Sequence, residues 1–366
     1  MILFVFVISI GCAEPKLLEQ IGITTLLGYD LGKEKKLLTT AVIRQVDPDF
    51  QSNVEIVSAE NRTSKGTRTE INRKTSKKVM SGQMRSILFG EELATDDIGH
   101  YIDTFAKDST MSGSILLAVV EGQTKSLLEY QYTNITDIGQ HIFKVLEQNI
   151  EGEQVISPTL HELTNDYYSA GRDSALPIIK RDDELIEISG VALFNKGKMV
   201  GKLPAEDSFY IKIFRDNYNA GTIDTFINAD NLPSSFAKTA PDGLAVVLDT
   251  IQSKKNLKLV NKDTPEFDLN ITVSARLLEI DNEVELGEPK NIIKLDQAIS
   301  KEMESQLSRV ISYSQEVGSD VFGFGEYYRS NVRQSKLTHE KWHELYKGAK
   351  INVKINVQIL RVGVFE

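Results

Sequence analysis

The first twelve residues constrain this chain more than any other segment. The run MILFVFVISI is almost wholly apolar, and Gly11 and the chain's single cysteine, Cys12, follow it directly. Ten apolar residues are about half of what a helix needs to cross a bilayer, but they match the hydrophobic region of a signal peptide. A single cysteine also excludes internal disulfides and Cys-x-x-Cys sites. We therefore expect residues 1–11 to direct export and the rest to fold outside the cytoplasm.

The residues around the cysteine predict a lipid anchor. Ser9-Ile10-Gly11-Cys12 resembles a lipobox, in which the thiol receives a diacylglyceryl group and the chain is cut before the cysteine. Two features differ from the usual pattern: Ser9 stands where Leu is common, and no Lys or Arg precedes the apolar run. A buried strand with an inert cysteine is the alternative. Two acyl chains, such as palmitate, anchor stably where one does not, so we expect lipidation at Cys12 and a tether over residues 12–20.

Charge and length limit the classes of function. The chain has 52 Asp and Glu against 42 Lys and Arg, a net charge of −10. Such a surface repels nucleic acid and gains nothing from an anionic bilayer, so we expect neither as an electrostatic partner. Because single cores stop growing near about 250–300 residues, 366 residues predict more than one domain.

Hydrophobic periodicity predicts a mixed α+β (α/β) protein. Strands and helices alternate over residues 21–204, which form an N-terminal α/β region that divides, as an alternative, into 21–134 and 135–204. Residues 135–180 are expected to be mostly helical, ending at Pro177. IEISGVALFNKGKMVGKL is the clearest hairpin, with its turn at 195–198. Residues 205–366 predict a C-terminal α/β domain with a helix from Ile292 that stops at Gly318 and a final strand that alternates in hydrophobicity.

The sharpest motif for chemistry is His339-Glu340-Lys341-Trp342-His343, which fits the zinc pattern H-E-x-x-H. Zinc needs a third protein ligand, and the 23 residues after His343 contain no histidine and are dominated by the final strand. We therefore predict a structural helix turn in which Trp342 packs and both histidines lie at the surface. No phosphate loop, GxSxG elbow or complete GxGxxG fingerprint is present. We expect no catalytic residue, no cofactor and no metal.

Four stretches resemble the C-subunit lipoproteins of spore germinant receptors, the Ger(x)C family. They are LLEQIGITTLLGYD; SGQMRSILFGEELA leading into YIDTFAKDSTM; the hairpin SGVALFNKGKMVGKL; and DVFGFGEYYRSN followed by KWHELYKGAKINVKINVQILRVG. The resemblance spans nearly the whole exported chain. It implies a multidomain fold of three α/β domains, with mixed sheets flanked by helices.

The same resemblance implies a role and partners. The chain is expected to be a non-enzymatic subunit, held by diacylglyceryl-Cys12 on the outer face of the spore inner membrane, beside membrane A and B subunits that respond to nutrients. Contacts with those partners are expected at the hairpin 195–199 and at 323–331, where Arg329 is the test residue. Two rival hypotheses remain: an extracytoplasmic solute-binding lipoprotein, and a lipid-anchored zinc hydrolase that uses His339 and His343.

Overall fold

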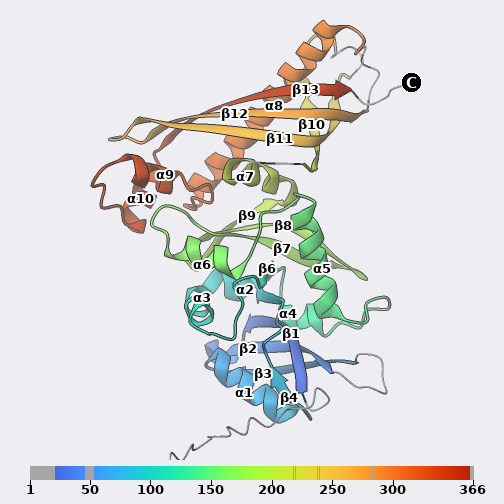
Figure 1. The fold of residues 1–366 in the computed structure, drawn as a ribbon, viewed down its shortest axis with the longest axis vertical. Coiled ribbons are helices and arrows are strands. Elements are labelled where there is room, and N and C mark those ends of the chain that lie inside the picture. Colours follow the sequence, from blue (N-terminus) through green and yellow to red (C-terminus); the bar gives the residue numbers. More distant parts are fainter. Residues whose placement is uncertain are drawn as a thin grey trace, which may run out of the picture.

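The computed structural model describes residues 21–45, 53–216, 218, 220–236, 238, 240–281, 284 and 286–362. The predicted signal peptide, Cys12 and the tether lie outside these ranges. Figure 1 shows an elongated molecule, in which the N-terminal strands lie at one end and the C-terminal sheet lies at the other. Two mixed sheets form its framework.

The first sheet has nine strands in the order β3-β2-β1-β5-β6-β7-β8-β9, with β4 beside β1. The middle strands β1, β5, β6 and β7 are parallel, whereas both outer parts of the sheet are antiparallel. The strands are β1 (Ile21–Leu31), β2 (Leu37–Gln45), β3 (Asn53–Asn61), β4 (Lys78–Met80), β5 (Ser86–Gly90), β6 (Leu116–Val120), β7 (Ala175–Asp182), β8 (Leu185–Asn195) and β9 (Lys198–Pro204).

Helices cover both faces of this sheet. One face packs against α1 (Ser64–Lys74), α2 (Glu91–Asp96), α3 (Gly99–Ala106) and α6 (Leu160–Tyr168). The other packs against α4 (Thr124–Leu128) and α5 (Ile138–Glu151). Every residue of β6 is buried, as expected of a central parallel strand covered on both faces.

One predicted boundary is wrong. Residues 135–180 were expected to be helical up to Pro177, but α6 ends at Tyr168 and Pro177 lies inside β7. Proline lacks the N–H that a central strand needs. The pairing of β7 with β6 begins only at Ile178, so the missing donor interrupts no bond on that side.

The second sheet has the order β10-β11-β12-β13, and its last pair is parallel. Its strands are β10 (Thr222–Asn228), β11 (Gly243–Asn261), β12 (Glu266–Ile280) and β13 (Lys350–Val362), and its helices are α7 (Ser208–Arg215), α8 (Pro289–Glu316), α9 (Phe324–Asn331) and α10 (His339–Tyr346). Short 3-10 turns lie at Lys33–Lys35, Ala205–Asp207 and Ala229–Asn231. The helices pack with the inner face of the sheet in one large core.

The predicted long helix and final strand are confirmed. The stripe of α8 is buried, and the helix ends two residues before Gly318, whose φ is +69°. The predicted fold class, mixed α+β with mixed sheets flanked by helices, is also confirmed, and the structure has two such sheets. The domain boundaries stay a prediction. Within the described residues, no helix is both long and apolar enough to cross a bilayer.

Candidate functional site

The two halves of the chain meet at a buried polar contact, which we call the joint. It comprises residues 169–174 and 194–196 from the N-terminal half, and residues 318–326 and α10 from the C-terminal half. Backbone bonds cross it: the Asp173 amide donates to the Asp320 carbonyl at 2.9 Å, and the Glu326 amide donates to the Gly171 carbonyl at 2.9 Å. Side chains add Asn195 Nδ2, which donates to the Gly318 carbonyl at 2.7 Å.

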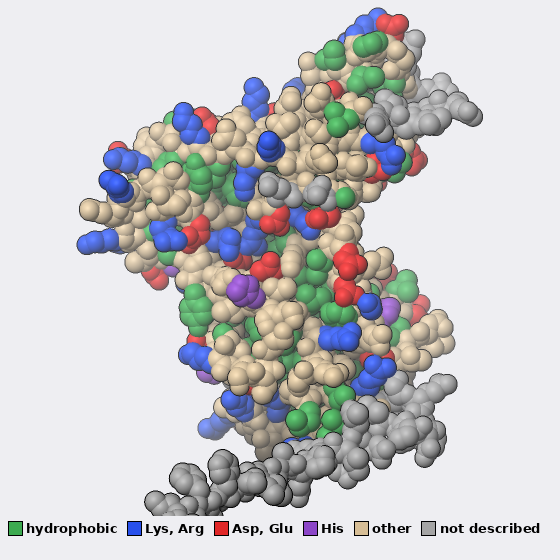
Figure 2. Space-filling view, in the orientation of Figure 1, with side chains coloured by type: hydrophobic (Ala, Val, Ile, Leu, Met, Phe, Trp, Pro, Cys, Tyr) green, Lys and Arg blue, Asp and Glu red, His purple; other side chains and the backbone are tan. Residues whose placement is uncertain are grey.

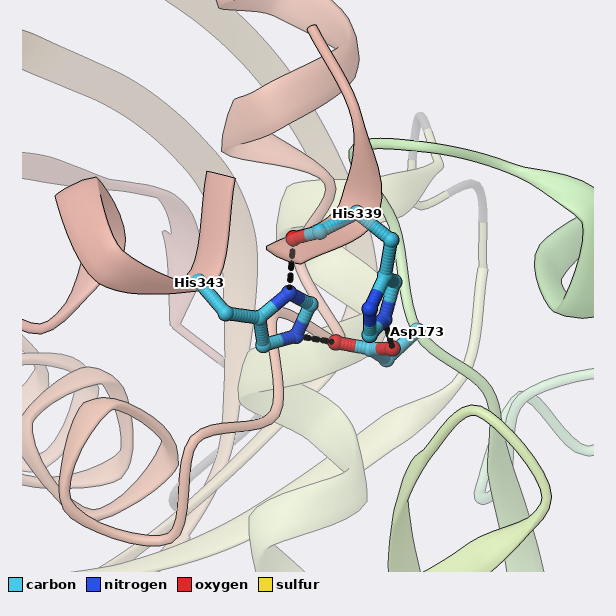
Figure 3. A group of neighbouring side chains, drawn as sticks. All are labelled: Asp173, His339 and His343. Carbon is cyan, nitrogen blue, oxygen red and sulfur yellow. Dashed lines mark hydrogen bonds and ion pairs between the residues drawn. The ribbon is translucent and has the colours of Figure 1, made fainter. Parts of the chain in front are cut away.

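The centre of the joint is the carboxylate of Asp173, which two histidines of α10 approach (Figure 3). His339 Nε2 lies 3.1 Å from Oδ1 and His343 Nε2 lies 2.6 Å from Oδ2. Residues four apart on a helix share a face, so both rings point to the same side, with centroids 3.8 Å apart. The Asp173 side chain is only 1% exposed. Among the described residues, these three form the group whose side chains could jointly coordinate one metal ion.

Charge pairing sets the protonation of this cluster. Burial by itself would raise the pKa of Asp173, but the two imidazoles outweigh it and lower that pKa to about 2. Burial would likewise lower the pKa of His343, but its hydrogen bond to Asp173 and the carboxylate charge raise it above the usual value. His343 Nδ1 donates to the His339 carbonyl at 2.8 Å, which fixes the orientation of the ring.

A second buried carboxylate, Asp320, organises the start of α9. It accepts backbone N–H bonds from Gly323, Phe324 and Gly325, and a fourth bond from Trp342 Nε1 at 2.8 Å. Its own amide donates to Asp173 Oδ2 at 2.8 Å. Complete burial raises the Asp320 pKa to about 6, and the nearby charge of Asp173 adds to this shift, whereas the hydrogen bonds from Gly325, Trp342 and Gly323 oppose it. The two acids therefore lie side by side at the joint.

The sequence Gly323-Phe324-Gly325 at the start of α9 allows this packing. Gly323 has φ +84°, in the left-handed region that glycine tolerates without strain. At Gly325 a Cβ atom would lie 2.5 Å from Trp342 Nε1 and 2.6 Å from the Cα of Gly171. A backbone bend and a close approach thus account for these two glycines.

The predicted position of the HEKWH histidines is wrong. Trp342 is fully buried, as expected, but His339 and His343 are buried too, with 9% and 8% exposure. Their burial is compensated by hydrogen bonds to the carboxylate of Asp173, which lies 166 and 170 residues upstream. The absence of a downstream third ligand was the reason to predict no metal, and Asp173 removes that reason. No local sequence signal marked Asp173, because its position depends on the packing of two distant segments.

Glu340, the base position of an H-E-x-x-H hydrolase, lies apart from the cluster. It is exposed, and it accepts hydrogen bonds from its own amide and from Thr338 at the start of α10. In a zinc hydrolase this glutamate would have to face the metal and its water. The cluster therefore contains three possible metal ligands but lacks the glutamate base that a zinc hydrolase would need.

The two stretches expected to contact partners are largely used inside the molecule. The hydroxyls of Tyr327 and Tyr328 donate to the carbonyls of Leu257 and Lys262. In the hairpin turn, Lys196 Nζ donates to the carbonyls of Tyr167 and Ser169. Arg329 is exposed and pairs with Glu326 one turn earlier.

Two family models match the chain and together span most of it. The model described as spore germination protein N-terminal domain matches residues 14–181. The model described as spore germination B3/GerAC like, C-terminal, matches residues 189–363.

Individual relatives extend over similar lengths. The chain is 27% identical to spore germination protein GerQC of Bacillus cereus over 365 residues, covering 100% of this chain and 98% of the relative. It is 22% identical to spore germination protein YndF of Bacillus subtilis (strain 168), covering 81% and 71%. The crystal structure of the GerBC protein superposes with a TM-score of 0.56 at 15% identity, covering 91% of this chain and 96% of that one, so the fold is shared.

Proposed function

Because the chain belongs to the Ger(x)C family of germinant-receptor C subunits, we propose that it is the lipid-anchored, non-catalytic C subunit of a nutrient germinant receptor. It would act beside membrane A and B subunits to trigger spore germination. The observation that carries this proposal is the pair of family matches, over residues 14–181 and 189–363.

The arrangement of the joint supports a non-catalytic role. Within the described residues, Asp173, His339 and His343 form the one candidate ligand group, and all three are engaged in hydrogen bonds between the two halves. A hydrolase would require a base beside them, but Glu340 is exposed and caps the start of its own helix.

The surface supports a protein or membrane-associated role over nucleic-acid binding. Figure 2 shows Lys and Arg interspersed with Asp and Glu across the visible face, without a continuous basic stripe. Nucleic-acid binding needs clustered positive charge. Confinement by a lipid anchor would instead raise the local concentration of the subunit near membrane partners, so that even a weak interface persists.

The anchor is tested by Cys12→Ala in spores that carry this receptor. Wild-type protein should partition into the detergent phase, whereas the variant should stay unprocessed or enter the aqueous phase, with slower germination on nutrients. Ser9→Leu is the matched control, since it changes the same segment, keeps the thiol and should behave as wild type. If Cys12→Ala partitions and germinates as wild type does, Cys12 is not lipidated and lipidation plays no part in germination.

The partner contact is tested separately by Arg329→Glu. The side chain is 55% exposed and its ion pair with Glu326 is a surface i,i+3 pair, so reversal should change the free energy of unfolding by less than about 1 kcal/mol. If α9 faces a membrane subunit, co-purification from spore membranes should weaken. A folded variant that retains its partners would exclude this segment from the interface.

A further inference from the structure

We propose that Asp173, His339 and His343 bind one divalent transition-metal ion of the Zn²⁺ class, which joins the two halves of the molecule. This site is additional to the receptor role and does not depend on it. Three observations carry the proposal: the convergence of three ligand atoms, the orientation of the rings, and the presence of two buried carboxylates.

The ligand atoms are already close to a metal-binding geometry. Both imidazole Nε2 atoms point at the same carboxylate, at 3.1 Å and 2.6 Å from its two oxygens. Around a tetrahedral ion with bonds of about 2.0–2.1 Å, neighbouring ligand atoms lie about 3.3 Å apart. The three ligand atoms already lie within 4.8 Å of one another, so small shifts would open the cluster around an ion. Two histidines and one carboxylate are ligands that Zn²⁺ accepts.

A hydrogen bond orients the histidine that lies nearer to the carboxylate. His343 Nδ1 donates its proton to the His339 carbonyl at 2.8 Å. In the neutral ring this leaves the Nε2 lone pair directed at the cluster, which is the usual arrangement of a metal-bound histidine. The Asp320 amide similarly fixes Asp173 Oδ2 from behind, at 2.8 Å. Both ligand side chains are therefore held before an ion arrives.

The charges of the joint fit a dication. Asp173 and Asp320 are 2% and 0% exposed and lie next to each other, and buried charges need compensation. Two neutral imidazoles with one divalent ion would balance both carboxylates.

The site has an entry path and a structural role. The side chains of His339 and His343 retain 10% exposure each, so the cluster is not sealed from solvent. Asp173 belongs to the N-terminal half and the histidines to α10, 166 and 170 residues away. One ion would thus close a long loop and connect the halves. Because Glu340 is exposed, the site is structural and not hydrolytic.

The experiment uses the full chain purified in detergent and stripped with chelator. Titration with Zn²⁺ followed by calorimetry and metal analysis should give one ion per chain, and the melting temperature should rise and fall back on adding EDTA. Co²⁺ in its place should give the visible absorption of a four-coordinate site. His339→Gln and His343→Gln keep an amide donor for Asp173 and should weaken binding at least about 100-fold.

The matched control is His161→Gln, an exposed histidine on α6, which should bind Zn²⁺ as wild type does. Asp173→Asn serves as a third ligand variant if it folds, and the two glutamine variants suffice if it does not. Less than about 0.2 ion per wild-type chain would overturn the proposal, as would equal binding by wild type and both glutamine variants. In either case the joint is held by its hydrogen bonds, ion pairs and packing without a metal ion.

Discussion

At the scale of single residues, the backbones of the two halves approach closely at Gly171 and Gly325. A Cβ atom on Gly325 would meet the Cα of Gly171 at 2.6 Å and the indole nitrogen of Trp342 at 2.5 Å. That nitrogen donates to Asp320, so one added methyl group would disturb both the packing and a buried hydrogen bond. The joint therefore tolerates no side chain at this position.

Gly325→Ala should lower the free energy of unfolding by about 1–5 kcal/mol. Alanine gains up to about 1 kcal/mol of helix propensity in α9, but overpacking costs about 1–3 kcal/mol and a displaced buried hydrogen bond about 1–3 more. Urea denaturation measures the difference. Gly82→Ala is the control, because nothing lies within 4 Å of its added Cβ; equal stability of the two variants would contradict close packing at the joint.

At the scale of elements, α8 covers the free edge of β13. The amides of Ile355, Val357 and Ile359 donate to the side chains of Glu304, Ser300 and Asp296, at 2.8, 2.9 and 3.0 Å. Four helical residues rise about 6.0 Å and two strand residues about 6.6 Å. The two repeats therefore stay in register over three contacts, and they protect an edge that would otherwise pair with other chains.

Removing these acceptors should destabilise the edge and expose it. Ser300→Ala should lower the free energy of unfolding by about 1 kcal/mol, measured by chemical denaturation. The triple change of Asp296, Ser300 and Glu304 to Ala should also cause concentration-dependent aggregation, measured by light scattering. Ser308→Ala is the control, since its hydroxyl bonds only within α8. A triple variant that stays monomeric at high concentration would show that side chains on α8 are not what protects β13.

Local patterns predicted the elements whose burial is periodic along the chain. The stripe from Leu295 to Ile311 marked α8, and the alternation at Ile355, Val357 and Ile359 marked β13. The strand containing Pro177 was missed because proline is typical of neither helices nor central strands. Its position in β7 is possible because β7 pairs with β6 only from Ile178 onward. The cluster at Asp173 was missed for the same kind of reason, since tertiary packing brings an isolated aspartate to a distant pair of histidines.

At the scale of the whole molecule, the polar contacts of the joint and a shared apolar core connect the two sheets. Figure 1 shows the sheets stacked along the long axis, with backbone and side-chain bonds crossing between them at Gly171, Asp173 and Asn195. Asp166 on α6 adds ion pairs to Arg172 and, across the same boundary, to Arg215 of α7. These contacts couple the N-terminal half of the molecule to its C-terminal half.

Asp320→Asn should break this coupling. The carboxylate accepts four N–H groups, whereas an amide has one oxygen and presents its own donors to the remaining N–H groups. Leaving buried donors unpaired costs about 1–3 kcal/mol each, so the start of α9 and its contact with Asp173 should loosen by about 3–5 kcal/mol in total. Scanning calorimetry should then resolve two transitions where wild type shows one. Asp263→Asn, in an exposed turn, should keep the single transition. If Asp320→Asn also unfolds in one step at the wild-type temperature, contacts other than Asp320 couple the two sheets.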